Sequence, residues 1–241
     1  MKYNPLTGAA YLLRGFFLLQ KPGVRQYVII PLSINVLLFS LVIWFGAGQF
    51  ERFTGWLLPE SYEWLEWFLW PLFALTMSVL VFFTFIHLGH LIGAPFNGLL
   101  SEAVEEYLSC RPAKEEMGLK RMIAGLGPVL ISEFRKIIYF LSRGLPLLML
   151  FFIPLLNILA PFIWVGFSAW MLALEYADYP MGNHGILFVE QRTRLKEKRL
   201  IVLGFGGATL ILLMIPFLNF IAMPTAVAGA TLMWVEQFAK K

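Results

Sequence analysis

Four long stretches without formal charge dominate the chain. They cover residues 27–50, 67–101, 137–174 and 200–235, and only Arg143 interrupts them. A transmembrane helix needs roughly 20 apolar residues to cross a hydrocarbon core about 30 Å thick. The first stretch has 24 residues and predicts one crossing. The second has 35 residues and predicts one crossing that either continues beyond the bilayer or ends near Gly89-His90 with a kinked extension.

The third and fourth stretches share an internal repeat. Each carries Ile-Pro-x-Leu-Asn at its centre, beginning at Ile153 and at Ile215, followed by alanine and proline. Proline removes a helical hydrogen bond, and asparagine is a common turn residue. The arms beside these turns have 11 to 17 residues. At about 1.5 Å per residue most of them are too short to cross a bilayer. The repeat therefore predicts two half-penetrating helical hairpins, with a pair of kinked ordinary spans as the alternative.

The first 22 residues predict an amphipathic helix on the membrane surface. Asn4 is a suitable N-cap, and Pro5 suits the first helical position. Residues 6–19 are almost all apolar. A narrow polar seam repeats every seven residues, at Thr7, Arg14 and Lys21. One polar seam on an apolar helix is typical of a segment that lies in the interface.

Two charged segments complete an all-α integral membrane protein with a single membrane domain. Residues 101–136 predict cytoplasmic helices that break at Pro112 and at 125–128. The expected parts are an amphipathic N-terminal helix (1–22), two long transmembrane helices (23–50 and 65–100), cytoplasmic helices (101–136), a first re-entrant hairpin (137–174), a cytoplasmic segment (175–199) and a second re-entrant hairpin (200–235).

Charge asymmetry sets the expected orientation. Residues 51–66 carry four glutamates against one arginine, a net charge of −3 (1 − 4), and 18 of the 19 basic residues lie elsewhere. Basic residues concentrate on the cytoplasmic side of membrane proteins. We therefore expect 51–66 outside and both termini in the cytoplasm. Antiparallel packing of protomers is compatible with the same charges.

Composition supports the membrane class and excludes others. Hydrophobic residues make up 59% of the chain and charged residues 14%, whereas soluble domains have about 45–50% and about 25%. A disordered chain would need low hydrophobicity. The single cysteine excludes an intramolecular disulfide framework and cysteine-rich metal sites.

The strongest candidate binding segment stands just before the first span. It comprises Gly23, Val24, Arg25 and Gln26. A helix start exposes unpaired N–H groups, and glycine lets an anion approach them closely. Arginine adds a fork of donors suited to a tetrahedral oxyanion. A plain positive-inside anchor is the alternative interpretation.

Four other charged residues are candidates for a pathway or for structural ion pairs. Arg143 is the only charge in its apolar stretch; it either snorkels to the interface, forms a second anion station or pairs with Glu133 or Glu175. Glu102, Glu105 and Glu106 share helical faces. We expect these three to pair structurally more than to line a path, because bare carboxylates would repel an anion.

Other chemistry has weaker signals. His87 and His90 are three residues apart, but no clear third metal ligand accompanies them. Glu175, Asp178 and His184 contain the groups of acid–base chemistry without a nucleophile or metal motif. Residues 203–207 superficially resemble a phosphate loop but lack the following lysine, and they predict helix packing instead.

Several motifs together resemble the CysZ family of bacterial sulfate permeases over nearly the whole chain. The motifs are Pro22-Gly23-Val24-Arg25, Gly93-Ala94-Pro95-Phe96 followed by Leu100-Ser101-Glu102, and Glu175-Tyr176-Ala177-Asp178-Tyr179-Pro180 with Asn183-His184. Each motif is weak alone, and their order and spacing together are fairly specific. The family's anion motif is Gly-Leu-Arg, often with a second Arg, and Gln26 stands here in place of that second charge.

The resemblance implies sulfate entry across the inner membrane for cysteine biosynthesis, without ATP. It also implies a homo-oligomer with two long spanning helices and half-penetrating hairpins in the lipid bilayer. We expect sulfate at Gly23, Val24, Arg25 and Gln26, and no enzyme activity, cofactor, metal or nucleic-acid partner. The alternatives are a membrane scaffold without a solute path, a membrane-embedded enzyme that uses His184, and an anion channel of broad selectivity.

Overall fold

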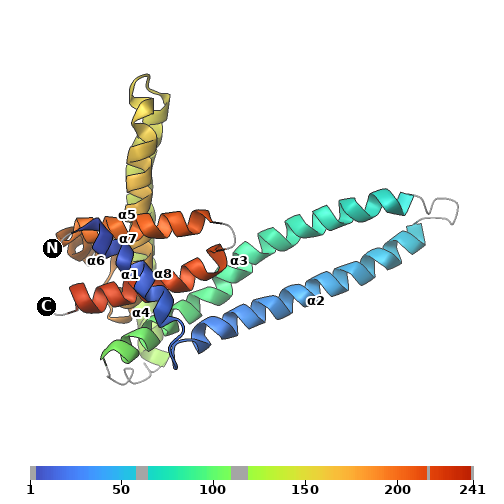
Figure 1. The fold of residues 1–241 in the computed structure, drawn as a ribbon, viewed down its shortest axis with the longest axis horizontal. Coiled ribbons are helices and arrows are strands. Elements are labelled where there is room, and N and C mark those ends of the chain that lie inside the picture. Colours follow the sequence, from blue (N-terminus) through green and yellow to red (C-terminus); the bar gives the residue numbers. More distant parts are fainter. Residues whose placement is uncertain (1–3, 58–64, 110–118, 216–217, 240–241) are drawn as a thin grey trace. The chain divides into compact units, whose positions relative to one another are not determined.

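The computed structural model describes residues 4–57, 65–109, 119–215 and 218–239, and all regular structure in these ranges is helical. The helices are α1 (Pro5–Leu18), α2 (Gln26–Leu57), α3 (Glu66–Ser109), α4 (Leu119–Met149), α5 (Ala160–Asn183), α6 (Phe188–Glu197), α7 (Arg199–Met214) and α8 (Asn219–Gln237), with the short 3-10 turns η2 (Leu150–Phe152) and η3 (Leu156–Ile158) (Figure 1). The all-helical class expected from the sequence is confirmed for these residues.

The chain divides into two compact units. One comprises residues 26–96, and the other comprises residues 1–25 with 97–241. In the first unit, α2 contacts α3 where Gly46 lies against the end of the Met77 side chain. Residues 26–49 of α2 are long and apolar enough to cross a membrane. The second expected span stays a prediction, because the side chains of residues 80–95 lie outside those that the structure describes.

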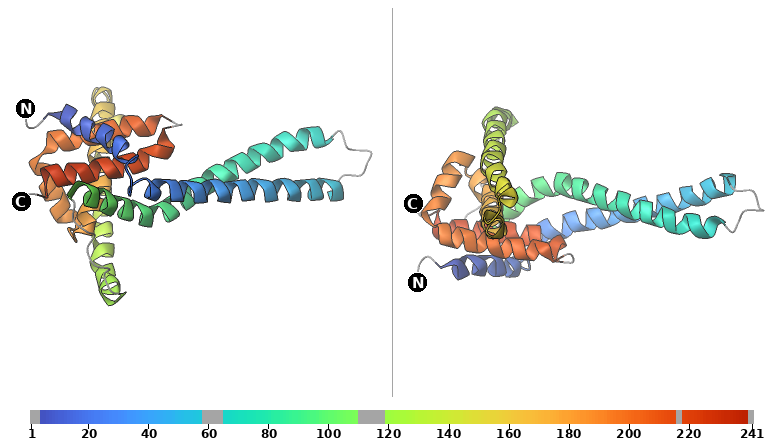
Figure 2. Two further views of the ribbon diagram at one scale, coloured as in Figure 1. Left: turned by 60° about the horizontal axis from the view of Figure 1, so that its bottom comes forward. Right: turned by 90° about the horizontal axis from the view of Figure 1, so that it is seen from above.

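In the second unit, α7 and α8 pack between α1 and α5 (Figure 2). The helices approach closely at glycines. Gly15 of α1 lies against the backbone of Gly229 in α8, and a Cβ on Gly206 of α7 would overlap the carbonyl oxygen of Ala169 in α5. Small residues let helix backbones meet without intervening side chains. The packing role expected for residues 203–207 is therefore confirmed.

The start of α1 follows the sequence expectation. The side chain of Asn4 accepts a hydrogen bond of 3.0 Å from the N–H of Leu6, and Pro5 stands in the first turn. The helix buries Tyr11, Leu12 and Leu18 in the second unit. Its placement on a membrane surface stays a prediction.

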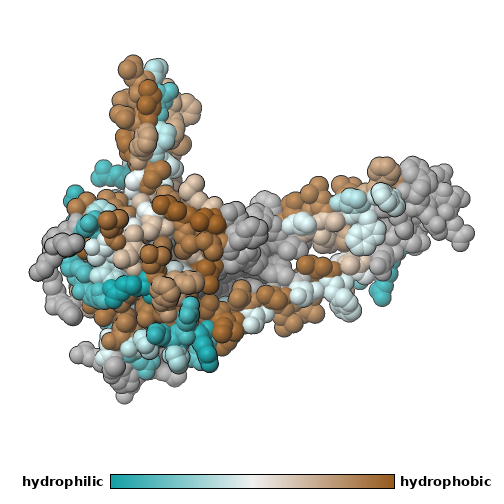
Figure 3. Space-filling view, viewed as in Figure 1, coloured by the Kyte–Doolittle hydropathy of each residue, from teal (hydrophilic) through white to brown (hydrophobic). Residues whose placement is uncertain are grey.

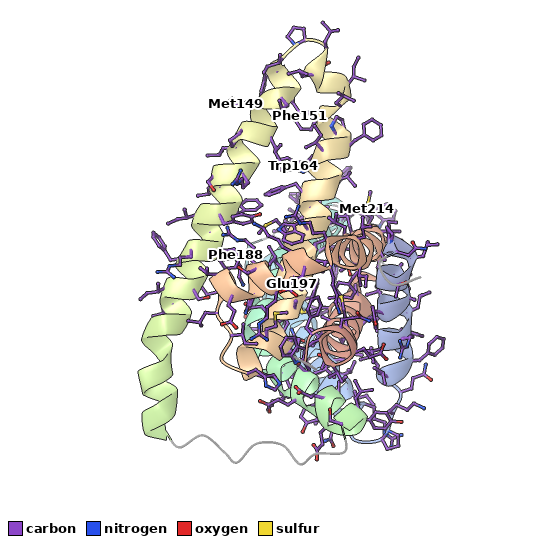
Figure 4. The ribbon with its side chains drawn as sticks, turned by 90° about the vertical axis from the view of Figure 1, so that its left-hand side faces the viewer. Met149, Phe151, Trp164, Phe188, Glu197 and Met214 are labelled. Atoms are coloured by element: carbon purple, nitrogen blue, oxygen red, sulfur yellow. The ribbon has the colours of Figure 1, made fainter. Side chains whose placement is uncertain are left out.

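Helices α4 and α5 form a hairpin that projects from the second unit (Figure 1). Phe140 stacks on Phe167 at 5.7 Å between ring centroids, and Phe151 contacts Trp164 nearer the end. Figure 4 shows Met149 and Phe151 toward the free end and the α6 residues Phe188 and Glu197 farther down. How deeply this hairpin or the α7–α8 pair enters a bilayer stays a prediction.

One expected helix break is wrong. Helix α4 runs without interruption from Leu119 to Met149, through residues 125–128. A proline inside a helix removes one hydrogen bond and usually kinks the helix without ending it. The apolar periodicity on both sides of this segment belongs to one helix. The other expected break, at Pro112, lies outside the described residues.

Candidate functional site

The predicted anion-binding segment forms a tight turn after α1. The backbone N–H groups of Val24 and Arg25 both donate to the carbonyl oxygen of Lys21, at 3.1 Å. Gly23 has a φ of +86°, and nothing lies within 4 Å of where its Cβ would stand. This left-handed conformation favours glycine, and the open space leaves its backbone accessible.

One side chain of this turn is buried, and the other residues are exposed. The side chain of Val24 is fully buried, whereas Gly23 and Arg25 are exposed. Gln26 is also exposed and begins α2. Because the Val24 and Arg25 N–H groups are used within the turn, the Arg25 guanidinium is the strongest donor left for an anion. Arg25 forms no ion pair with any other residue that the structure describes.

The end of α3 meets α5 and α8 through polar contacts. The Ser101 and Thr231 hydroxyls lie 2.9 Å apart and are both fully buried. Nδ2 of Asn97 donates to the Tyr179 hydroxyl at 3.4 Å, and Nδ2 of Asn183 donates to the Gly98 carbonyl oxygen at 3.2 Å. The fold thus brings together motifs that are about 80 residues or more apart in sequence.

Among the three candidate glutamates, Glu105 has a described partner. Nε2 of His184 lies 2.8 and 2.9 Å from its two carboxylate oxygens. The His184 ring also lies against Trp234, with 5.5 Å between centroids. Glu105 therefore pairs with His184, while Glu102 and Glu106 are exposed.

Lys136 of α4 forms ion pairs with three carboxylates. Its Nζ lies 2.7 Å from Asp178, 3.1 Å from Glu133 and 3.4 Å from Glu175. Burial alone would lower the pKa of Lys136, but the summed charges of Asp178, Glu175 and Glu133 outweigh it and raise that pKa above the usual lysine value. Lys136 therefore stays charged and ties α4 to α5.

This cluster includes the two glutamates that the sequence offers as partners for Arg143. Glu133 and Glu175 pair with Lys136, because Glu133 is three residues away on the same helix and α5 brings Glu175 to the same level. Arg143 stands two turns farther along α4, about 10 Å away. The enzyme alternative would combine Asp178 and His184 in one acid–base site. In the structure Asp178 pairs with Lys136, whereas His184 pairs with Glu105.

Arg143 instead lines an open cleft between α4, α5, α6 and α7. The cleft has a volume of about 540 Å³. Its lining includes three further basic residues, Arg192, Lys196 and Arg199, together with Trp170 and Ser142. The basic stretch at 192–199 is visible in the sequence, but its meeting with Arg143 and Trp170 depends on the tertiary fold.

Metal binding finds no support in the described part of the chain. It contains no group of three histidine, cysteine or acidic residues that could hold a metal ion. The side chains of His87 and His90 lie outside the described residues.

Comparison with known proteins gives similarity over almost the full length. Residues 11–224 match the EI24 family, described as Sulfate transporter CysZ/Etoposide-induced protein 2.4. Proteins named Sulfate transporter CysZ are 43% identical in Pseudomonas paraeruginosa PA7 (98% of this chain and 97% of the relative) and 42% identical in Pseudomonas aeruginosa PAO1 (96% of each). The protein of that name in Vibrio atlanticus is 40% identical and covers 97% of this chain and 94% of its own.

Proposed function

The chain belongs to the EI24/CysZ family, and from this premise we propose that it is a sulfate permease. It moves sulfate across the bacterial inner membrane into the cytoplasm for cysteine biosynthesis, without ATP hydrolysis. The observation that carries the proposal is identity of 40–43% to relatives named Sulfate transporter CysZ over nearly the full length of both chains.

Sulfate binds at the turn formed by Gly23, Val24, Arg25 and Gln26. The exposed Arg25 guanidinium supplies the charge, and the open left-handed Gly23 lets the anion reach the backbone. Buried Val24 anchors the turn, and Gln26 offers an uncharged amide where the family often has a second arginine. Glu102 and Glu106 are exposed near the end of α3 and stay outside the anion's path.

The protein works as a homo-oligomer with cytoplasmic termini. The free end of the α4–α5 hairpin exposes large apolar side chains, among them Phe152, Leu155 and Phe162. Such a surface needs cover from lipid or from another copy of the chain. The buried half of α5 packs on α7 and α8, which leaves the outer half to enter the bilayer.

The deciding experiment is radiolabelled sulfate uptake into proteoliposomes that contain only this protein. We expect uptake above that of empty liposomes, with a loss of about tenfold in sulfate affinity for Arg25→Ala, because one charged donor is removed. Lys21→Ala is the matched control: Lys21 is exposed in the same turn, and its hydrogen bonds there are made by its backbone, which the substitution keeps.

The other outcomes separate the alternatives. Absence of uptake by folded, reconstituted protein would replace the permease with a membrane scaffold. Uptake that chloride or nitrate inhibits as well as sulfate does would indicate an anion channel of broad selectivity. Equal sulfate affinity in Arg25→Ala and Lys21→Ala would move the binding site away from this turn.

A further inference from the structure

We propose that the basic cleft at the base of the α4–α5 hairpin is a second binding site, for a tetrahedral oxyanion. It is separate from the turn at residues 22–26. The site is defined by Arg143, Arg192, Lys196 and Arg199, with Trp170 and Ser142 beside them. A phosphate group of an anionic phospholipid and a free sulfate or phosphate ion share the required chemistry.

The charge of the cleft is uncompensated within the described part of the protein. No acidic residue lines it, and none of its four basic side chains forms an ion pair with a described residue. Three carboxylates on the two hairpin helices form ion pairs with Lys136 instead, those of Glu133, Glu175 and Asp178. Four like charges around one cavity repel one another, so a bound anion would stabilise the arrangement.

Two buried donors in the cleft also lack partners. Nε1 of Trp170 and Nε of Arg192 are both inaccessible to solvent and make no hydrogen bond within the described structure. Buried polar groups are nearly always paired, and an exception requires an explanation. Both side chains line the cleft, so a small rotation toward bound ligand oxygens would supply the missing acceptors.

Arg192 is already held in place. Its guanidinium lies 5.0 Å from the ring centroid of Tyr139 and 6.0 Å from that of Phe188. These aromatic contacts restrict the side chain before any ligand arrives, which lowers the entropy cost of binding. A planar guanidinium also matches the paired oxygens of phosphate or sulfate.

The position of the cleft suits a lipid headgroup. Arg143 lies six residues before Met149 at the end of α4, which corresponds to about 9 Å along the helix. Half of a bilayer's hydrocarbon core is about 15 Å thick. The 3-10 turn Leu150–Phe152 adds about 6 Å, at about 2.0 Å per residue. A hairpin whose apolar end reaches the middle of the bilayer would therefore place Arg143 at the edge of the hydrocarbon core, beside the headgroups. The cleft also has an apolar wall at Pro146, Leu147 and Phe167, along which an acyl chain can lie. The surface of the hairpin above it is largely apolar (Figure 3).

The test measures binding at equilibrium, so that its result is independent of transport. It uses the full-length protein in detergent in an Arg25→Ala background, which removes the main charge of the other site. Native mass spectrometry measures retention of phosphatidylglycerol against phosphatidylcholine, and calorimetry measures binding of sulfate and of inorganic phosphate. The variants are Arg143→Gln and Lys196→Gln, both at exposed side chains. Arg135→Gln is the matched control, because it removes one exposed charge from α4 outside the cleft.

We expect Arg143→Gln and Lys196→Gln each to weaken phosphatidylglycerol binding about tenfold, and Arg135→Gln to change it less than twofold. The same pattern for sulfate or phosphate, without lipid retention, would identify the ligand as a free ion and also support the site. If neither probe distinguishes the cleft variants from Arg135→Gln, the proposal is overturned. Trp170→Phe tests the same point with no change of charge, since it removes the indole N–H while keeping an aromatic ring at this position.

Discussion

Single hydroxyl and carboxylate groups hold distant segments of this protein together. Ser101 and Thr231 are 130 residues apart in sequence and form a buried hydroxyl pair. Thr231 also bonds the Val227 carbonyl oxygen within α8, at 2.8 Å. Such a pair adds little net energy while both partners are present, but either group costs free energy when it is buried alone.

Thr231→Val tests this pair. The substitution keeps the shape of the side chain and leaves the Ser101 hydroxyl buried without its partner. We expect the free energy of unfolding to fall by about 1–2 kcal/mol, measured by thermal unfolding in detergent. The double variant Ser101→Ala/Thr231→Val should lose less than the sum of the two single variants, because no hydroxyl is then left unpaired. Strictly additive losses would contradict a direct bond.

At the scale of helices, close backbone contact fixes how α7 sits against its neighbours. Gly206 lies against the Ala169 backbone, whereas nothing lies within 4 Å of a Cβ on the neighbouring Gly207. The two glycines are adjacent in one helix and differ only in what they face. They provide a matched pair for testing the packing.

We expect Gly206→Ala to lower the free energy of unfolding by roughly 1–3 kcal/mol, because a methyl group there forces α5 and α7 apart. Gly207→Ala should be neutral or stabilising by up to about 1 kcal/mol, since alanine is the better helix former. Thermal unfolding of the two variants in the same detergent makes the comparison. Equal effects would mean that α5 and α7 do not meet at this face.

The charge cluster at Lys136 joins the two helices of the α4–α5 hairpin. Lys136 has 11% of its side chain exposed and Asp178 has 28%, whereas Glu133 and Glu175 are about half exposed. Solvent screens the two glutamates more strongly, so Asp178 contributes most. Gln191 of α6 also donates to Asp178, at 2.5 Å, which connects α6 to the same point.

We expect Lys136→Met to reduce the free energy of unfolding by roughly 2 kcal/mol, because it leaves Asp178 partly buried without its cation. The raised pKa of Lys136 means that its contribution is fully present below the unfolded lysine pKa and is lost only as pH rises through the higher folded value. The difference from the parent protein should therefore stay constant between pH 6 and pH 9, as followed by thermal unfolding at each pH. Glu133→Gln is the control and should cost far less.

Local chemistry explains which features of these helices could be predicted. The Asn4 cap and the packing role of residues 203–207 depend on neighbouring residues and were correctly predicted. The break at 125–128 was wrong because glycine and proline weaken a helix locally without deciding whether it continues. Residue spacing could not predict that Glu175 pairs with Lys136 and not with Arg143. That choice depends on which turn of α4 lies opposite Glu175 of α5. The cleft could not be predicted for the same reason, although its basic stretch was visible.

At the scale of the whole molecule, the acidic excess is concentrated in one short segment. The acidic residues 51–66 follow the apolar part of α2, and 18 of the 19 basic residues lie elsewhere in the chain. Large apolar side chains are exposed along α2 and at the free end of the α4–α5 hairpin. Lipid or further copies of the chain must cover these surfaces. The charge distribution then predicts which side of the membrane each segment faces.

Cysteine labelling tests this orientation directly. In a Cys110→Ser background, Arg52→Cys should react with a membrane-impermeant maleimide in intact spheroplasts, because residues 51–66 carry the acidic excess and are expected outside. Gln20→Cys, at an exposed site just after α1, should react only after lysis if the N-terminus is cytoplasmic. The reverse pattern would show that the positive-inside rule does not govern this chain. Reaction of both sites from outside would mean that protomers insert in two opposite orientations, and an oligomer of antiparallel copies would then place equivalent anion-binding turns on both faces of the membrane.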